Sequence, residues 1–284
     1  MALKIAIQGG KASFHEIASH QYFDEEIEVV ECRTFKKVGD MVAAGEVDYG
    51  LMAIENSIAG HILQNYTIIK ERNLFVSGEI KLRIKQNLMV LPGQKIEDLH
   101  RISSHYMALR QCKEFLEPWD PTIELEEFYD TADAAKEIRE KNLSGVGAIA
   151  GEMAAEVYDL EIIAESIETI KKNFTRFLVL QKENKAIHSK EVLNKATLSF
   201  ELSHHVGALA KILQVIVDYK VNLTMIQSVP IIGKPDEYTF YVDCMWDNYQ
   251  HWERCKAVLR NYVKHAQIIG EYKNWEIVYD NFSS

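Results

Sequence analysis

Short apolar runs alternate with amphipathic stretches along the first part of the chain, and this pattern predicts strands that alternate with helices. Such alternation is typical of an α/β fold with largely parallel sheets. Ser13 and Glu16 have the spacing of a capping box, which predicts a helix directly after the first strand. The expected strands are residues 4–8, 27–31, 48–54, 84–91, 99–102, 123–128, 145–150 and 160–164, and the other expected helices cover about 36–45, 131–141 and 151–158, with one more opened by Ser103-Ser104-His105.

The pattern changes after a charged segment, residues 182–195, that contains no clear strand. Beyond it, apolar periodicity predicts the order β-α-β-β-α-β of a ferredoxin-like unit. Its expected strands are 196–202, 222–231, 237–244 and 268–272, and its expected helices are 207–220 and 248–263.

The sequence therefore predicts an α/β protein with a first domain at 1–183, a linker at 184–195 and a second domain at 196–284. The first domain is expected to have two lobes, about 1–80 plus 172–183 and 81–171. A cleft between two lobes is a natural site for a small molecule.

Composition indicates a soluble globular protein, with 47% hydrophobic and 26% charged residues among 284. No apolar run approaches the roughly 20 residues that cross a bilayer, and Met1 leads straight into a strand, which leaves no room for a signal peptide. The four cysteines lack metal-ligand or CxxC spacing, so reduced thiols and a cytoplasmic location are expected. A formal net charge of −10 argues against a nucleic-acid partner and leaves an anionic small molecule open.

Polar clusters at strand ends are the candidate chemistry. Asn173, Thr175 and Arg176 precede the apolar run 177–180; arginine offers a donor fork for a carboxylate, and threonine offers one proton. A second cluster, Glu55-Asn56-Ser57, follows an expected strand, where ligands bind in open α/β sheets.

Each cluster also has a structural interpretation. Ser104 and Asp130 or Thr131 are reasonable helix N-caps, and Glu55 could bond backbone amides. The sequence contains no P-loop, GxGxxG, HExxH or cysteine–histidine metal motif. From the residues alone we expect a cofactor-free, two-lobed protein that binds an anion, and no reaction is named.

The clusters, in this order, resemble those of prephenate dehydratases. The matching stretches are IAIQGGKASFHEIAS, AIENSIAGHI, SSHYMALRQC, YDTADAAKEI and NFTRFLVL, and LSHHVGALAKIL resembles the start of the family's carboxyl-terminal ACT domain. The resemblance implies a catalytic domain like type II periplasmic binding proteins, followed by an ACT regulatory domain. It also implies a hydro-lyase that turns prephenate into phenylpyruvate in phenylalanine biosynthesis without a cofactor, in a homodimer or homotetramer.

The resemblance also assigns roles to residues. Thr175 is expected to face the leaving hydroxyl, and Arg176 a substrate carboxylate, unless Arg176 instead holds the loop by pairing with Glu55. The catalytic candidates are Thr175, Arg176 and Ser104, the substrate-binding candidates are Asn56, Ser57, Thr131, Asn173, Phe177 and Glu55, and the effector-binding candidates are Gly207, Ala208, Leu209, Gln227 and Ser228.

Two departures from the family pattern leave questions open. Lys11 stands in the first loop, where relatives usually have a glycine-containing turn. The family's Glu-Ser-Arg-Pro effector motif is Gln227-Ser228-Val229-Pro230 here, which leaves inhibition by phenylalanine open. The alternatives are an arogenate dehydratase, a non-catalytic two-lobed binding protein, and an amino-acid sensor built on the ACT domain.

Overall fold

The computed structural model describes residues 2–119, 121–183, 192–202 and 205–275. The chain forms two compact units: Met1–Val38, Leu51–His61 and Lys81–Phe177 make the first, and Gly39–Gly50, Ile62–Ile80 and Leu178–Ser284 make the second. The described residues contain no helix that is long and apolar enough to span a membrane. The cytoplasmic location stays a prediction.

The amino-terminal sheet contains the strand order β2-β1-β3-β11-β5, with β4 paired to β3. β1 and β2 are parallel, with Ile5 opposite Val29, and the interior strands are almost wholly buried, as their continuous apolar runs predict. Ser13 caps the first helix by accepting a hydrogen bond from the Glu16 backbone, as predicted. The elements are β1 (Leu3–Gln8), α1 (Phe14–Tyr22), β2 (Ile27–Cys32), α2 (Phe35–Ala44), β3 (Tyr49–Asn56), β4 (Gly60–His61), α3 (Leu63–Glu71), β5 (Phe75–Arg83) and β11 (Phe174–Gln181).

The second sheet has the order β10-β6-β9-β7-β8. β7 is parallel to β8 and β9, whereas β6 is antiparallel to β9 and β10, so this sheet is mixed rather than largely parallel. Two apolar clusters pack on it, one around Ala135 and Ile138 and the other around Leu88 and Ile102. Its elements are β6 (Asn87–Val90), β7 (Arg101–His105), α4 (Tyr106–Gln111), α5 (Lys113–Leu116), β8 (Glu124–Phe128), α6 (Thr131–Lys141), β9 (Val146–Ala150), α7 (Glu152–Val157) and β10 (Glu161–Ala164), with short 3-10 turns at Ile96–Asp98 and Glu117–Trp119.

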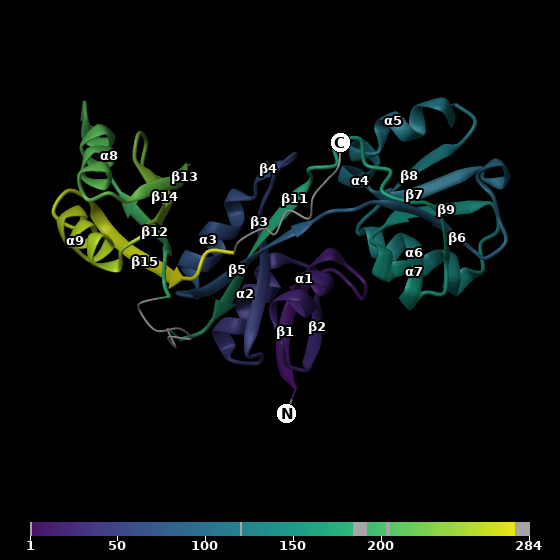
Figure 1. Cartoon of the computed structure of the whole chain (residues 1–284), viewed down its shortest axis with the longest axis horizontal. Helices are drawn as coiled ribbons and strands as arrows, with labels where there is room; N and C mark the ends of the chain where they lie inside the picture. Colours follow the sequence, from purple (N-terminus) through teal and green to yellow (C-terminus); the bar gives the residue numbers. More distant parts are fainter. Residues whose placement is uncertain (1, 120, 184–191, 203–204, 276–284) are drawn as a thin grey trace. The chain divides into compact units, whose positions relative to one another are not determined.

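The carboxyl-terminal region forms a four-stranded antiparallel sheet with the order β13-β14-β12-β15. Both helices cover the same face of this sheet (Figure 1) and bury Ile212 and Trp252 against Leu198 and Phe200. The predicted ferredoxin-like order is confirmed. Its elements are β12 (Lys195–Glu201), α8 (Ala208–Asp218), β13 (Asn222–Pro230), β14 (Tyr238–Met245), α9 (Tyr249–Leu259) and β15 (Lys264–Tyr272).

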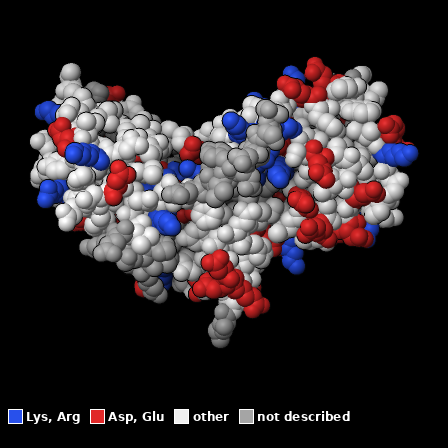
Figure 2. All heavy atoms as spheres, in the orientation of Figure 1, with Lys and Arg blue, Asp and Glu red and all other residues white. Residues whose placement is uncertain are grey.

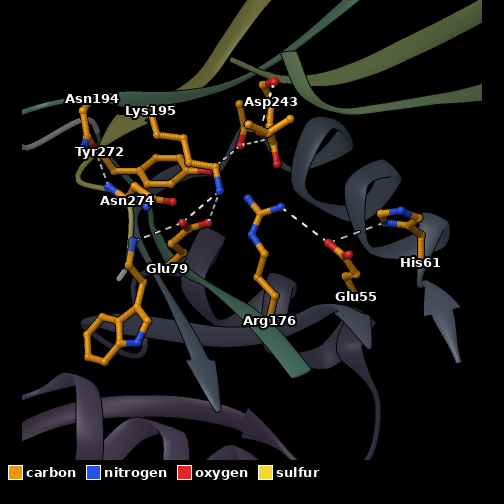
Figure 3. Close-up of polar contacts among 12 residues, drawn as sticks. Glu55, His61, Glu79, Arg176, Asn194, Lys195, Asp243, Tyr272 and Asn274 are labelled. Atoms are coloured by element: carbon orange, nitrogen blue, oxygen red, sulfur yellow. Dashed lines mark hydrogen bonds and ion pairs between the residues drawn. The ribbon is translucent and has the colours of Figure 1, made fainter. Parts of the chain in front are cut away.

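The other face of this sheet is buried as well, and it is polar. The Thr197 hydroxyl donates to the Asp243 carboxylate at 2.6 Å and lies 2.7 Å from the Tyr272 hydroxyl. The Lys195 ammonium bonds both oxygens of Glu79 at 2.9 and 2.8 Å (Figure 3), and both side chains are almost fully buried. This pair ties the first strand of the ferredoxin-like region to β5 within the second unit.

Several sequence-based boundaries were wrong. β3 runs on through Glu55 and Asn56 instead of ending at residue 54, and neither α3 nor β5 was expected. Residues 103–105 belong to β7, so the helix after them begins at Tyr106 and its N-cap is His105. Of the predicted linker, residues 184–191 lie outside the described residues, and Lys195 is already the first residue of β12.

Charge is distributed without a strong basic region on the face drawn in Figure 2. Acidic and basic side chains are interspersed there, and acidic ones gather near the amino ends of β1 and β2, where Asp24, Glu25 and Glu26 are exposed. The four cysteines are free and buried, as predicted for reduced thiols.

Candidate active site

The hairpin β3–β4 and the start of β11 form the frame of the candidate site. Glu55 and Asn56 pair with His61 and Gly60 across the hairpin. The turn between them is tied to β11 through Ser57, whose N–H donates to the Phe174 carbonyl at 2.9 Å.

Ser57 has a structural role in this frame. Its hydroxyl accepts from the Phe174 N–H at 2.9 Å and donates to the Lys172 carbonyl at 3.2 Å. The hydroxyl proton of this predicted substrate-binding residue is therefore engaged by the backbone.

The Asn56 carboxamide has a fixed orientation. Its Oδ1 accepts from the backbone N–H groups of Ile58 and Ala59 at 3.0 and 2.8 Å, so Nδ2 must face the other way. Nδ2 donates to Asn173 Oδ1 at 2.8 Å and to Thr175 Oγ1 at 3.0 Å. Because the threonine oxygen accepts this hydrogen, its own proton points away from Asn56. Sequence analysis predicted all three polar residues, and the structure brings them together.

Gln111 extends this row of hydrogen-bonded side chains, and the sequence did not predict it. The hydrogen-bonded amides of Asn56, Asn173 and Gln111 together form the amide chain of the site. Gln111 Oε1 accepts from Asn173 Nδ2 at 3.0 Å, and Asn173 is fully buried with both ends of its amide engaged. With its oxygen turned toward Asn173, Gln111 presents its amide N–H groups as donors on the opposite side. The residue is the last one of α4, within the stretch SSHYMALRQC, but nothing in its local pattern separates it from a surface glutamine.

Arg176 is buried and paired with Glu55 (Figure 3). It follows Thr175 directly on β11, so the two side chains point to opposite faces of the sheet. Arg176 Nη1 lies 3.8 Å from Glu55 Oε2, which in turn lies 3.9 Å from His61 Nδ1. Only 5% of Arg176 is exposed, and a buried guanidinium requires a charge partner. The structure thus contains the Arg176–Glu55 ion pair, and a role of Arg176 toward a substrate carboxylate stays a prediction.

Three other predicted residues have contacts outside the Asn56–Asn173–Gln111 chain. Ser104 is fully buried, and its hydroxyl donates across the sheet to the Ile149 carbonyl at 2.5 Å, so its interpretation as a helix N-cap was wrong. Thr131 is the first residue of α6 and is mostly buried. Phe177 lies in the core, with its ring 4.9 Å from that of His15.

Asp130 lies between the first loop and α6. It caps α6 by accepting from the Ala132 N–H at 2.8 Å, as predicted. Gly9 has a φ of 101°, and a Cβ on it would lie 3.0 Å from Asp130 Oδ2, so both conformation and close approach require glycine there. Burial raises the pKa of Asp130 to about 6. A carboxyl with a pKa of about 6 thus faces the first loop at Gly9.

The effector candidates belong to the ferredoxin-like region. Gly207 has a φ of 83° and is the N-cap of α8, which begins with Ala208 and Leu209. Gln227 and Ser228 lie on β13, opposite Tyr241 and Phe240.

The donor set of the candidate site consists of amides, a hydroxyl and a guanidinium. Such groups suit an oxyanion rather than a metal ion. Within the described parts of the chain, no group of three histidine, cysteine or acidic residues could hold a metal.

Comparison with known proteins identifies the family. The model for prephenate dehydratase matches residues 5–185, and the chain belongs to the prephenate dehydratase family. It is 36% identical over 250 residues to arogenate dehydratase/prephenate dehydratase 2, chloroplastic, of Arabidopsis thaliana. The matched region covers 85% of this chain and 65% of the Arabidopsis protein. It is 32% identical to the bifunctional chorismate mutase/prephenate dehydratase of Aquifex aeolicus, over 95% of this chain and 73% of that one. The chain spans 65% of the length of the Arabidopsis thaliana protein and 61% of that of another curated relative, the bifunctional chorismate mutase/prephenate dehydratase of Buchnera aphidicola subsp. Acyrthosiphon pisum.

Solved structures agree with this fold along nearly the whole chain. The prephenate dehydratase from Arthrobacter aurescens in complex with L-Phe has a TM-score of 0.85 and 25% identity, over 95% of this chain and 90% of that one. A protein described as GqqA, a novel type of quorum quenching acylase, has a TM-score of 0.87 and 26% identity, over 96% and 98%.

Proposed function

We propose that this chain is a prephenate dehydratase, a carbon–oxygen lyase that converts prephenate to phenylpyruvate in phenylalanine biosynthesis. The observation that carries the proposal is the amide chain, in which Asn56 donates to the Thr175 hydroxyl oxygen and so turns the threonine proton away from itself. Membership of the family supplies the reaction, and the geometry is suited to it.

The reaction releases a ring hydroxyl as hydroxide while the bond to the ring carboxylate breaks and its electron pair completes the aromatic ring. Carbon dioxide leaves, and hydroxide takes a proton to form water. Aromatisation drives the step, so the protein has to hold the dianion in reactive geometry and stabilise the departing oxygen. Thr175 is placed to donate to that oxygen, and Gln111 offers amide donors nearby. Arg176, oriented by Glu55, contributes positive charge for a carboxylate.

The proposed domain arrangement is a catalytic domain at 1–183 and an ACT regulatory domain at 196–284, in a homodimer or homotetramer. Phenylalanine is the proposed effector, since a related solved structure contains L-Phe. The N-terminus of α8 at Gly207 offers backbone N–H groups to a carboxylate. Gln227-Ser228-Val229 lacks the charges of the family motif, which would weaken the affinity for phenylalanine.

Arogenate dehydratase is the second candidate, because relatives from Arabidopsis thaliana and Petunia hybrida carry that name. Arogenate has an amino group where prephenate has a keto oxygen. The two activities differ in their products, which are phenylalanine and phenylpyruvate.

Product formation from each substrate tests the proposal. Purified protein should release phenylpyruvate from prephenate, followed by its ultraviolet absorbance, and phenylalanine from arogenate would be followed by chromatography. Thr175→Val should lower kcat by about 100- to 1,000-fold, as expected when one transition-state donor is lost, whereas Thr175→Ser keeps the hydroxyl and should retain most activity. Product from arogenate alone would favour the second candidate. A folded Thr175→Val variant with wild-type kcat would refute the role of Thr175. The absence of product from both substrates would favour a non-catalytic binding protein.

A further inference from the structure

Two segments of the first unit, residues 86–87 and 166–168, are hydrogen-bonded to each other near the amide chain. The Ile167 N–H donates to the Gln86 carbonyl at 2.7 Å, and the Gln86 N–H donates to Glu168 Oε2 at 2.9 Å. The Ser166 N–H donates to Asn87 Oδ1 at 2.9 Å. Residues 166–168 and 86–87 are therefore fixed to each other by three hydrogen bonds.

Burial of the Glu168 carboxylate is unfavourable for the stability of the folded protein. The residue is 0% exposed, and within the part of the chain that the structure describes its second oxygen, Oε1, has no hydrogen-bond partner. A buried carboxylate that is only partly satisfied is unfavourable compared with a neutral side chain of the same size. Stability alone therefore does not account for a glutamate at this position.

Gln86, whose backbone Glu168 holds, and Thr169, the residue after Glu168, both contact Gln111. The Gln86 side chain donates to Gln111 Oε1 through a long hydrogen bond of 3.5 Å, and the Thr169 N–H donates to the Gln111 backbone carbonyl at 2.8 Å. Gln111 Oε1 also accepts from Asn173, which continues the chain to Thr175. Gln111 is thus held at both its backbone and its side chain by residues next to Glu168.

The Glu168 carboxylate also affects the thiol of Cys112, the residue that follows Gln111. Burial raises the pKa of Cys112, the residue after Gln111, to about 12, and the negative charge of Glu168 adds to this effect. The Glu168 carboxylate therefore lies near enough to the end of α4 to affect Cys112 electrostatically.

We propose that Glu168 is a positioning residue of this site: its carboxylate fixes the Gln86 backbone, so that Gln86 and Thr169 hold Gln111 with its oxygen toward Asn173 and its amide N–H groups toward the substrate. The inference rests on the proposed function, because it assigns a role within that reaction. Glu168 does not touch the substrate in this arrangement and acts through Gln111.

Two substitutions at this position separate positioning from charge. Glu168→Gln keeps an oxygen for the Gln86 N–H and should leave kcat within about 3-fold of wild type. Glu168→Leu has no acceptor and should lower kcat by about 10- to 100-fold, the scale of a small misplacement at a reacting centre, with KM changed by less than about 3-fold. Wild-type kcat in Glu168→Leu, or equal losses in both variants, would overturn the proposal.

A matched control excludes a general effect of removing a carboxylate. Glu161 Oε2 also accepts a backbone N–H, that of Gly93 at 2.7 Å, and it is not part of the amide chain. Glu161→Leu should therefore keep wild-type kcat and KM. All variants are assayed at a temperature where each is fully folded, so that a purely structural role of Glu168 would leave kcat unchanged.

Side-chain amide exchange gives a readout that does not depend on turnover. In nuclear magnetic resonance spectra, the carboxamide protons of Asn173 and Gln111 should exchange slowly in wild type and Glu168→Gln and faster in Glu168→Leu. Unchanged exchange in Glu168→Leu would refute the positioning role even if the wild-type protein converted neither prephenate nor arogenate. Absence of turnover with the expected exchange pattern would remove the proposed function alone.

Discussion

A buried histidine should make the stability of this protein sensitive to acid. His15 lies on α1 with its ring 4.9 Å from that of Phe177 and 5.6 Å from that of Phe35. Only 9% of the residue is exposed, and among the described residues its Nε2 has no hydrogen-bond partner. Burial lowers the pKa of the imidazole from 6.5 to about 3, because a charged ring loses its hydration in this environment.

The direction of the effect follows from this lowered pKa. A base with a lower pKa in the folded state contributes stability that is fully present above pH 6.5 and is lost as the pH falls toward 3. At pH 5 the His15 imidazole of the unfolded chain is mostly protonated and that of the folded protein is mostly neutral. The difference corresponds to about 2 kcal/mol of unfolding free energy at pH 5, and to about 5 kcal/mol at and below pH 3.

Urea unfolding of wild type and His15→Leu between pH 8 and pH 4.5 measures this term. Leucine has a similar volume and cannot be protonated, so the variant should lose about 2 kcal/mol less than wild type between pH 8 and pH 5. The comparison concerns slopes, so a lower baseline stability of the variant does not affect it. His20→Gln, which changes an exposed histidine of the same helix, should keep the wild-type profile. Parallel profiles of wild type and His15→Leu would refute the reasoning.

Three further predictions concern stability and are measured by urea unfolding. The pKa of Asp130 is raised to about 6, so its favourable contribution to the free energy of unfolding is present at acid pH and lost as the pH rises through 6. Asp130→Asn keeps the cap oxygen and should gain up to about 3 kcal/mol of unfolding free energy at pH 8 and nothing below pH 4. An equal gain at every pH would contradict this prediction. Glu79→Leu removes the carboxylate that accepts two hydrogen bonds from the buried Lys195 ammonium and should cost about 3–5 kcal/mol. The double variant with Lys195→Met should recover most of that loss, and an equal loss in the double variant would be inconsistent with the argument. Gly270→Ala would make a Cβ overlap the Val76 carbonyl oxygen and should cost about 1–3 kcal/mol. Wild-type stability of this variant would show that the overlap does not form.

Local patterns in the sequence predicted local structure well. Ser13 was predicted to cap the first helix, and Asp130 was one of two candidates, with Thr131, for the cap of α6. Ser13 and Asp130 both accept the backbone N–H bond of a helix cap. The ferredoxin-like order was predicted because each of its elements has one apolar face on a common core. In these cases the signal lies within one or two turns of the residue concerned.

Elements that bury polar side chains were missed. The buried face of α3 includes Asn65, and β5 buries Ser77 and Glu79, so neither segment has the regular apolar pattern that predicts a helix or a strand. The partner that makes Glu79 acceptable is Lys195, which is 116 residues further along the chain. A single sequence does not reveal such a pairing.

The error at Ser104 has a related cause. Serine before a helix usually caps it, but here the sheet supplies other partners for the hydroxyls of β7. Ser103 donates to Glu126 on one neighbouring strand, and Ser104 donates to the Ile149 carbonyl on the other. Because both hydroxyls are satisfied within the sheet, the strand continues for three residues beyond its predicted end, through His105, which becomes the cap.

The direction of the hydrogen bonds at Thr175 shows what a sequence can and cannot determine about a site. The turn after Asn56 engages Oδ1 through two nearby N–H groups, and this part is local. The consequence is remote, since Nδ2 then reaches Asn173 and Thr175, 117 and 119 residues away. A motif can identify a threonine, but only this long-range contact shows that its oxygen accepts a hydrogen bond and that its proton therefore points away from Asn56. The catalytic character proposed for Thr175 is therefore a property of the folded amide chain rather than of the motif alone.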